Sequence, residues 1–342
     1  MSLVQSALQR LLERQDLGRA GARELVLAIM DGQVTPAQVG AVLVAMRMKG
    51  ETVEEIVGAA EAMRARATPV VTRRRPVVDT CGTGGDGSGS FNISTAAAFV
   101  VAAAGVCVAK HGNRAVSSAC GSADVLEALG VRIDLGPVEA GRCLDEAGIA
   151  FLFAPRYHPA MKHAAGPRRE IGARTVFNLL GPLANPVGAN RQLLGAYSAE
   201  AARLLAEALV QLGSERALVV HGHGGLDELA LTGPNQVFEV RDGQLSAYEM
   251  TPEEAGLKRR AAPRLEGGDP ARNAALLRAV LAGEEGDPLD AVLFNAGAAL
   301  LVAGRVERVE DGVAEARNLV RSGAAGERLD MLQRLSQAGP KD

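Results

Sequence analysis

The sequence has no tryptophan, few aromatic residues of any kind (3%) and only four cysteines. The cysteines form no CxxC pair, which argues against a disulfide framework or a structural zinc site and favours free thiols in a reducing compartment. No stretch approaches the roughly 18 uncharged apolar residues of a membrane-spanning helix, and the first residues lack the apolar run of a signal peptide. We therefore expect a cytoplasmic protein.

The sequence also has no large excess of charge of one sign. Its formal net charge is -3, whereas non-specific binding to nucleic-acid phosphates requires an excess of basic residues. With 47% hydrophobic and 23% charged residues, the composition is that of a globular protein and excludes disorder. A length of 342 residues suggests two domains and is ample for a large core.

Residues 1–72 are expected to form a small helical domain. Apolar residues recur there at helical spacing, and two helix starts carry capping signals, Thr35-Pro36 and the capping box from Thr52 to Glu55. Because this part holds little chemistry, we expect it to serve packing or dimerisation. The basic, proline-bracketed segment 68–76 is interpreted as a solvated linker.

Residues 73–342 are expected to form a larger α/β domain around a mostly parallel sheet. Short β-branched or apolar runs alternate there with alanine-rich helical segments, as in βαβ units. A hairpin is predicted over 236–250, where two strand-like runs flank Asp242-Gly243. The other predicted strands are 76–80, 106–110, 131–135, 149–154, 192–198, 216–222 and 291–297.

The glycine-rich stretch from Asp79 to Thr95 follows a predicted strand and leads into a helix that begins near Asn92 or Ser94. Backbone N–H groups at such a helix start favour an anion, so a phosphate ligand is expected. The stretch matches GxGxxG, but the next strand ends in Lys110 rather than in the carboxylate of a dinucleotide fold. A P-loop is excluded as well, since no Gly-Lys-Ser/Thr follows the glycines.

Three charged residues near this stretch have two interpretations each. Asp86 has one interpretation as a ligand-binding residue, which faces a hydroxyl, an amine or a metal ion. In the other, its side chain accepts from nearby backbone in an Asx turn. Lys110, at the end of the next strand, binds phosphate or is a surface lysine. Arg114 binds an anion or stabilises its loop through a salt bridge.

Adjacent carboxylates occur at Asp227 and Glu228, after a strand and a glycine-rich turn. Such a pair suits Mg²⁺, which takes few protein oxygens and completes its shell with water and ligand phosphates. Acids in a first helical turn are the alternative. His221 and His223 are a weak zinc signal, because no third ligand is evident.

A cationic cluster lies between residues 156 and 186. Arg168, Arg169 and Arg174 exceed what a simple helix face needs, so one of them is a candidate for a bidentate contact with a substrate carboxylate. Ordinary helix-surface charge is the alternative. No Ser-His-Asp or Cys-His pattern is present, so no covalent enzyme intermediate is expected.

Taken together, the order and spacing of these motifs resemble the anthranilate phosphoribosyltransferase family over nearly the whole chain. The motifs are Gly82-Thr83-Gly84-Gly85-Asp86, Asn92-Ile93-Ser94-Thr95, Lys110-His111-Gly112-Asn113-Arg114, Gly121-Ser122-Ala123-Asp124, the segment 168–186 and Asp227-Glu228.

The resemblance implies a step of tryptophan biosynthesis in which anthranilate displaces pyrophosphate from 5-phosphoribosyl 1-pyrophosphate with Mg²⁺. It also implies a homodimer and a nucleoside phosphorylase/phosphoribosyltransferase-like fold. Helices within 165–190 would return to the small domain, and the site would lie at the hinge. A neutral aromatic amine needs no strong general base, so no single side-chain deletion should behave like the loss of a nucleophile.

The resemblance also implies roles for individual residues. Ser94, Asp227 and Glu228 would serve magnesium, and Gly82, Asn113 and Arg168 would face anthranilate. In place of Cys120 and Ala119 the family usually has serine and lysine, so these two are not assigned. The residues implied for phosphoribosyl pyrophosphate are Gly82, Gly85, Asp86, Ser90, Asn92, Ile93, Ser94, Thr95, Lys110, His111, Gly112, Asn113, Arg114, Ala115, Val116, Ser117, Ser118 and Ser122.

Two alternatives stay open at this point. A pyrimidine nucleoside phosphorylase has a similar fold and its own phosphate loop, but it does not need paired magnesium carboxylates. A non-catalytic, nucleic-acid-binding relative would be expected to carry a basic surface, against the acidic net charge.

Overall fold

The structure is a computed structural model that describes residues 2–115 and 119–339. Its centre is a seven-stranded sheet with the strand order β3-β2-β1-β4-β5-β6-β7. The first five strands in this order are parallel and the last two pair antiparallel, so the sheet is mostly parallel, as predicted. The strands are β1 (Val77–Gly82), β2 (Cys107–Gly112), β3 (Ile149–Phe153), β4 (Arg191–Gly195), β5 (Arg216–His221), β6 (Asn235–Arg241) and β7 (Gln244–Met250).

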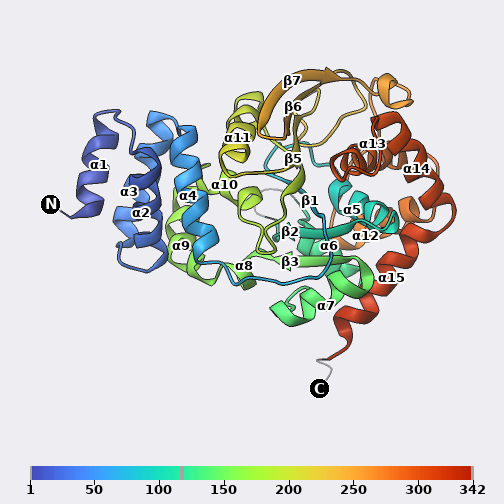
Figure 1. Cartoon of the computed structure of the whole chain (residues 1–342), viewed down its shortest axis with the longest axis horizontal. Helices are drawn as coiled ribbons and strands as arrows, with labels where there is room; N and C mark the ends of the chain where they lie inside the picture. The colour runs from blue at the N-terminus through green and yellow to red at the C-terminus, as the bar shows by residue number, and fades with distance from the viewer. Residues whose placement is uncertain (1, 116–118, 340–342) are drawn as a thin grey trace.

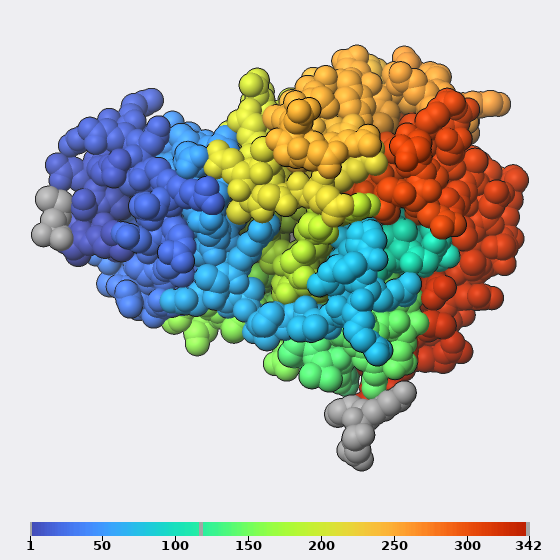
Figure 2. Space-filling view, in the orientation of Figure 1, coloured from blue at the N-terminus to red at the C-terminus, as the bar shows by residue number. Residues whose placement is uncertain are grey.

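The N-terminal residues form four helices, as the periodicity predicts. They are α1 (Leu3–Leu12), α2 (Gly18–Met30), α3 (Pro36–Lys49) and α4 (Val53–Ala65). Thr35 and Thr52 both form capping boxes, which satisfy backbone N–H groups that would otherwise lack partners at the helix starts. Figure 2 shows these helices at one end of the elongated molecule and the C-terminal helices at the other.

The remaining helices cover the sheet or extend from its ends. They are α5 (Ile93–Ala103), α6 (Ser122–Ala128), α7 (Pro137–Ala147), α8 (Ala154–Tyr157), α9 (Lys162–Ile171), α10 (Phe177–Leu180), α11 (Ala199–Gln211), α12 (Pro270–Leu281), α13 (Asp287–Val302), α14 (Val309–Arg321) and α15 (Ala324–Gln337). Single 3-10 turns lie at Pro159–Met161, Gly181–Leu183 and Glu253–Ala255. Among the described residues, no helix is both long and apolar enough to cross a membrane.

Two predicted strands are wrong. Residues 131–135 are buried at alternate positions but irregular, and the Arg132 N–H donates to Ser336 of α15 rather than to a neighbouring strand. Residues 291–297 belong to α13, which is buried on nearly every side. An apolar run with no polar face has no period that separates a buried strand from a buried helix.

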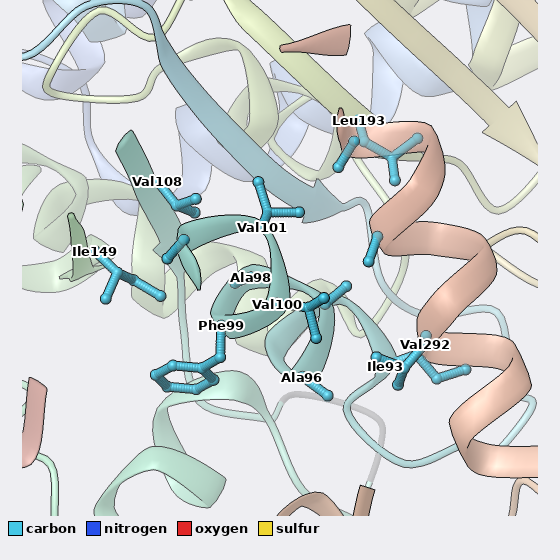
Figure 3. Close-up of a cluster of buried hydrophobic side chains, with 14 of the residues drawn as sticks. Ile93, Ala96, Ala98, Phe99, Val100, Val101, Val108, Ile149, Leu193 and Val292 are labelled. Carbon is cyan, nitrogen blue, oxygen red and sulfur yellow. The ribbon is translucent and has the colours of Figure 1, made fainter. Parts of the chain in front are cut away.

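Helix α5 is the centre of the larger core. It packs on β1 and β2 on one side and on α13 and α15 on the other, so its side chains are buried all round. Figure 3 shows Ile93 near Val292 of α13, and Val101 on the side of α5 that faces the sheet. This packing fixes the start of α5 relative to the end of β1.

The segment 68–76 is not the solvated linker that its charge suggests. Val70 and Thr72 are buried, and the Thr72 hydroxyl donates to Asp145 of α7 at 2.6 Å. The Thr68 N–H donates to the carbonyl of Tyr157 at 2.8 Å. The segment is therefore packed against the α/β part that it enters (Figure 1).

Helices α9 and α10 pack on the N-terminal helices although they follow β3 in the chain. Helix α9 contacts α2 and α3, and α10 contacts α4. Leu179 and Leu180 lie in the same apolar cluster as Ile56 and Met63. The four N-terminal helices thus meet a segment from the middle of the chain.

Two buried histidines contact each other near the end of β2. The rings of His111, on β2, and His158 are 5.1 Å apart, and both side chains are buried. Removal from water lowers the pKa of His111 to about 3 and that of His158 to about 4. Both rings are therefore neutral in the folded protein at pH values where they would charge in the unfolded chain.

We expect Gly58→Ala to destabilise the protein by about 1–3 kcal/mol. A methyl group at Gly58 of α4 would overlap the backbone carbonyl of Arg19 in α2, so the two helices would have to move apart. The control is Gly40→Ala in α3, where the added methyl group meets nothing within 4 Å. The control should be neutral or stabilising in urea unfolding, and equal effects of the two substitutions would contradict the close packing of α2 on α4.

We expect His111 and His158 to destabilise the folded protein increasingly as the pH falls from 7 to 5. Between pH 6.5 and about 4 the unfolded state binds protons that His111 and His158 cannot take in the folded state, which costs roughly 2 kcal/mol for each at pH 5. Asp79, Asp227 and Glu228 have the opposite effect, because burial raises their pKa values to about 6, 7 and 8. The contribution of a histidine is therefore measured as a difference between variants.

In urea unfolding, the stability of His158→Leu relative to the unsubstituted protein should increase by roughly 2 kcal/mol from pH 7 to pH 5, whereas that of the exposed control His223→Leu should stay constant. A constant difference for His158→Leu would refute the assignment.

Candidate active site

The ends of three neighbouring strands carry glycines, and the Asp227-Glu228 turn lies on them. Gly82 ends β1, Gly195 ends β4 and Gly222 follows β5, and these strands are parallel neighbours in the sheet. A methyl group at Gly195 would overlap the carbonyl oxygen of Asp227, and one at Gly222 would overlap that of Glu228. Only residues without a side chain let the acidic turn approach the sheet this closely.

The Asp227 carboxylate closes over the start of the glycine-rich loop. Its Oδ2 accepts a hydrogen bond from the Gly84 N–H at 2.8 Å, and a Cβ at Gly82 would lie 2.8 Å from the same oxygen. The Asp227 N–H donates to Asp86 at 3.3 Å. Two acidic side chains far apart in the sequence therefore lie next to each other.

Asp86 adopts the Asx turn that was one of its two interpretations. Its Oδ1 accepts the N–H of Ser88 at 3.1 Å. Gly84, Gly85 and Gly87 have positive φ angles of 66°, 75° and 75°, a backbone region that glycine enters without strain. Ser90 ends the loop, where it forms an isolated bridge with Glu266.

The N-terminus of α5 faces the other carboxylate. Asn92 is the N-cap residue, and the Ser94 N–H donates to Glu228 Oε1 at 3.0 Å. Thr95 is buried, and its hydroxyl has no hydrogen-bond partner among the described residues. The Ile93 side chain lies in the core, which leaves its main chain as the group available to a ligand.

Lys110 is not a surface lysine. It is buried within β2, two residues before the strand ends, and its ammonium group donates to the carbonyl of Thr80 and to Ser94 Oγ, the latter at 3.2 Å. Burial lowers its pKa, while the negative charges of Asp79 and Glu228 oppose that shift. Its charge therefore lies beside the start of α5.

Burial raises the pKa of both turn carboxylates. For Asp227 the charge of Asp86 adds to the shift, and for Glu228 the charge of Asp227 does so. Three acids thus share a small region in which Lys110 is the buried cation. A positive ion bound here would lower their mutual repulsion.

Asp79 and Asn185 were not among the sequence candidates. Asp79 is fully buried in β1 and accepts hydrogen bonds from the His111 N–H at 3.2 Å and from Asn185 Nδ2 at 2.9 Å. Asn185 also donates to the carbonyl of Ala109 at 2.8 Å. The ends of β1 and β2 are thereby fixed to the segment that follows α10. The sequence signal for Asp79 is a carboxylate within a predicted strand that begins with apolar residues.

The turn after β2 is held by its own side chains. Arg114 takes the salt-bridge alternative, with Nη1 2.9 Å from Asp124 and 2.5 Å from Glu127. The Ser122 hydroxyl donates to the Asn113 carbonyl at 3.3 Å, and the Ala115 N–H donates to Asp124 at 3.0 Å.

Other residues of this turn contribute differently. A Cβ at Gly112 would overlap the hydroxyl of Ser122, and the His111 ring lies 3.1 Å from the carbonyl of Gly181. The carbonyl of Cys120 accepts from Asn92 at 3.2 Å, so this position touches the α5 cap through its main chain. The candidates Val116, Ser117 and Ser118 lie outside the described residues.

The three arginines of the 156–186 cluster differ in their surroundings. Arg174 lies 3.9 Å from the Tyr197 ring centroid and donates to the carbonyl of Gly85, so it ties its segment to the glycine loop. Arg168 is half-buried over the Phe177 ring, and its guanidinium makes no hydrogen bond or ion pair with the described residues. Arg169 is exposed.

The residues at the acidic turn fit a magnesium ion. Asp227, Glu228 and the Ser94 hydroxyl offer hard oxygen atoms, which Mg²⁺ prefers. Over residues 2–115 and 119–339, no group of three or more His, Cys, Asp or Glu side chains is placed to hold a metal ion, so protein side chains alone would give Mg²⁺ few ligands. A two-carboxylate site leaves coordination positions for water and phosphate. His223 instead contacts Thr232 at 2.9 Å, and His221 contacts the carbonyl of Ala196 at 2.9 Å.

Comparison with known proteins agrees with this architecture. Residues 5–67 match the model of a glycosyl transferase family helical bundle domain, and residues 74–326 match that of a glycosyl transferase family a/b domain. An anthranilate phosphoribosyltransferase of Anaeromyxobacter dehalogenans is 57% identical over 96% of this chain and 98% of its own length. That of Moorella thermoacetica is 53% identical over 96% of this chain and 97% of its own length.

Solved structures give the same result. The enzyme of Thermus thermophilus superposes with a TM-score of 0.92 at 48% identity, covering 97% of this chain and 99% of that one. The Saccharomyces cerevisiae enzyme in complex with PRPP and Mg has a TM-score of 0.90 at 28% identity, with 97% of each chain covered. These relatives support the transferase and neither a pyrimidine nucleoside phosphorylase nor a nucleic-acid-binding relative. The chain belongs to the anthranilate phosphoribosyltransferase family.

Proposed function

We propose that this protein transfers the phosphoribosyl group of 5-phosphoribosyl 1-pyrophosphate to the amine of anthranilate, which releases pyrophosphate. The observation that carries the proposal is the meeting of the acidic turn, the α5 N-terminus and the buried Lys110 at one edge of the sheet. These are the groups that a magnesium pyrophosphate leaving group requires. The relatives' names supply the acceptor, anthranilate.

We assign phosphoribosyl pyrophosphate to the glycine loop, the first turn of α5 and the turn after β2. Backbone N–H groups of the loop and helix can donate to phosphate oxygens, and the unpartnered Thr95 hydroxyl is one further donor. Lys110 adds positive charge at the same point. The assigned residues are Gly82, Gly85, Asp86, Ser90, Asn92, Ile93, Ser94, Thr95, Lys110, His111, Gly112, Asn113, Arg114, Ala115, Val116, Ser117, Ser118 and Ser122.

Asp227, Glu228 and Ser94 are the residues that we expect to hold Mg²⁺. When bound, the metal would neutralise charge that develops on pyrophosphate as it leaves. The carboxylates join the turn to the glycine loop and to the first turn of α5. Lys110 would stabilise the same charge from within the sheet. Positioning and electrostatics thus carry the catalysis, in accord with the absence of a nucleophile pattern in the sequence.

Arg168 is our candidate for the anthranilate carboxylate, together with Gly82 and Asn113. Its guanidinium is half-buried and has no described anionic partner, so a planar carboxylate can pair with it in a bidentate manner. The arylamine attacks as the neutral base and needs no deprotonation first. This division of roles explains why an arginine rather than a general base faces the acceptor.

We further propose a cytoplasmic homodimer. Four large apolar side chains are exposed on α1 and α3, Leu3, Leu12, Val44 and Met48, with exposed fractions between 39% and 74%. Such residues on neighbouring helices suit a protein interface. The four buried free thiols support a reducing compartment.

We also propose that residues 1–72, joined by helices within 165–190, form the small domain, and that residues 73–342 form the large one. Packing of α9 and α10 on the N-terminal helices supports this division. The active site would then lie where the two domains meet.

The direct test is a fluorescence assay with purified protein, anthranilate, phosphoribosyl pyrophosphate and Mg²⁺. We expect the anthranilate signal to decay only when both substrates and the metal are present, and a chelator should stop the decay. No decay from folded protein would refute the proposed function.

The double variant Asp227→Asn/Glu228→Gln should raise the Mg²⁺ concentration needed for half-maximal activity by about tenfold or more, an effect that outer-sphere partners alone can reach. The isosteric amides keep the shape of the turn but lose its negative charge. Circular dichroism would establish that the variant is folded. An unchanged metal titration would refute the magnesium assignment.

Arg168→Ala should raise the KM for anthranilate by about 10- to 100-fold, the cost of one charge-assisted hydrogen-bonding partner. The KM for phosphoribosyl pyrophosphate should change little, because among the described residues no hydrogen bond or ion pair joins Arg168 to the glycine loop. Arg169→Ala, at the exposed neighbouring position, is the matched control. Equal KM values for the two variants would contradict the assignment.

A further inference from the structure

A fully buried asparagine on α13 holds the acidic turn from behind. Asn295 has no exposed surface and lies in a helix whose other core-facing side chains are apolar. Its Oδ1 accepts the Leu229 N–H at 3.0 Å, and its Nδ2 donates to the Leu229 carbonyl at 3.1 Å. One side-chain amide therefore pairs with both backbone groups of the residue that follows Glu228.

The orientation of this amide is fixed. The second hydrogen of Nδ2 is directed to the carbonyl of Ala291, 3.0 Å away in the same helix. Both donors and the acceptor of Asn295 thus have partners, as a buried amide requires. Leu229 is itself fully buried, so its main chain cannot shift toward solvent without breaking these bonds and uncovering its side chain.

A second buried asparagine frames the same loop at a greater distance from the carboxylates. Asn235 accepts from the N–H groups of His223 at 3.2 Å and Ala230 at 2.7 Å, and donates to the carbonyl of Met250 at 2.9 Å. It shapes the loop as a whole and fixes it to β7. Of these two asparagines, Asn295 is the one that pairs with Leu229, the residue directly after Glu228.

We propose that Asn295 is a positioning residue for the magnesium-binding carboxylates, which it holds through the main chain of Leu229. The strand-end glycines support the turn from the sheet side, and Asn295 holds it from the α13 side, so the carboxylates cannot retreat from the site. Mg²⁺ demands near-ideal octahedral geometry, so a small displacement of Glu228 would weaken binding. This inference rests on the magnesium assignment of the proposed function.

The test compares Asn295→Leu, Asn295→Asp and Ser336→Ala. Leucine removes both bonds to Leu229, and aspartate keeps an acceptor for the Leu229 N–H. Ser336 is an equally buried hydrogen-bonding residue, on α15, that accepts from the Arg132 N–H at 3.1 Å. It therefore controls for a general loss of stability, which thermal unfolding would record for each variant.

Two readouts are measured: the dissociation constant of Mn²⁺ by calorimetry in the presence of pyrophosphate, and the Mg²⁺ dependence of the transferase assay. Asn295→Leu should raise both metal constants by about tenfold and leave the KM for anthranilate unchanged. Asn295→Asp should give an intermediate shift, and Ser336→Ala none. If Asn295→Leu does not fold, Asn295→Asp alone carries the comparison.

Metal constants in the Asn295 variants equal to those of Ser336→Ala would overturn the inference while the proposed function stands. A different result separates the two claims. The magnesium assignment fails if the unsubstituted protein shows no metal-dependent transfer. It also fails if Asp227→Asn/Glu228→Gln binds Mn²⁺ as tightly as the unsubstituted protein binds it. In either case this inference fails as well.

Discussion

The close approach of the Asp227-Glu228 turn to the ends of β1, β4 and β5 is the constraint on which the site depends. Gly195 and Gly222 leave room for the two carbonyl groups of the turn, and a side chain at either position would displace it. The parallel order of these strands brings their carboxyl ends to one edge, where ligands of α/β folds bind. Two carboxylates are thereby held next to the helix start to which we assign the phosphates.

The surrounding charges follow from this placement. Two acids with raised pKa values next to Asp86 are costly without a cation, and the buried Lys110 offsets only part of their repulsion. Because its acidic groups repel one another, this site is suited to bind a metal ion together with a polyanion. Substrate binding and relief of repulsion are then the same event, which is how this sheet edge can favour a charged leaving group.

Much of the fold and the ligand chemistry could be predicted from the sequence, because local signals agreed with the tertiary structure. The capping box at Thr52, the hairpin at Asp242-Gly243 and the glycine loop before α5 are such cases. The alternation of apolar and polar residues over 131–135 indicates burial of one face, but it does not show that the segment pairs with a strand. The apolar run in α13 has no periodicity that distinguishes a helix from a strand. The role of Gly195 depends on a contact across 32 residues of sequence, which no local pattern reveals.

The measurement that tests this account most directly is anomalous diffraction from crystals grown with Mn²⁺ and phosphoribosyl pyrophosphate. The account predicts a manganese peak bound by the Asp227 and Glu228 carboxylates, with the pyrophosphate next to the first turn of α5. A well-ordered pyrophosphate whose manganese lies away from both carboxylates would contradict it.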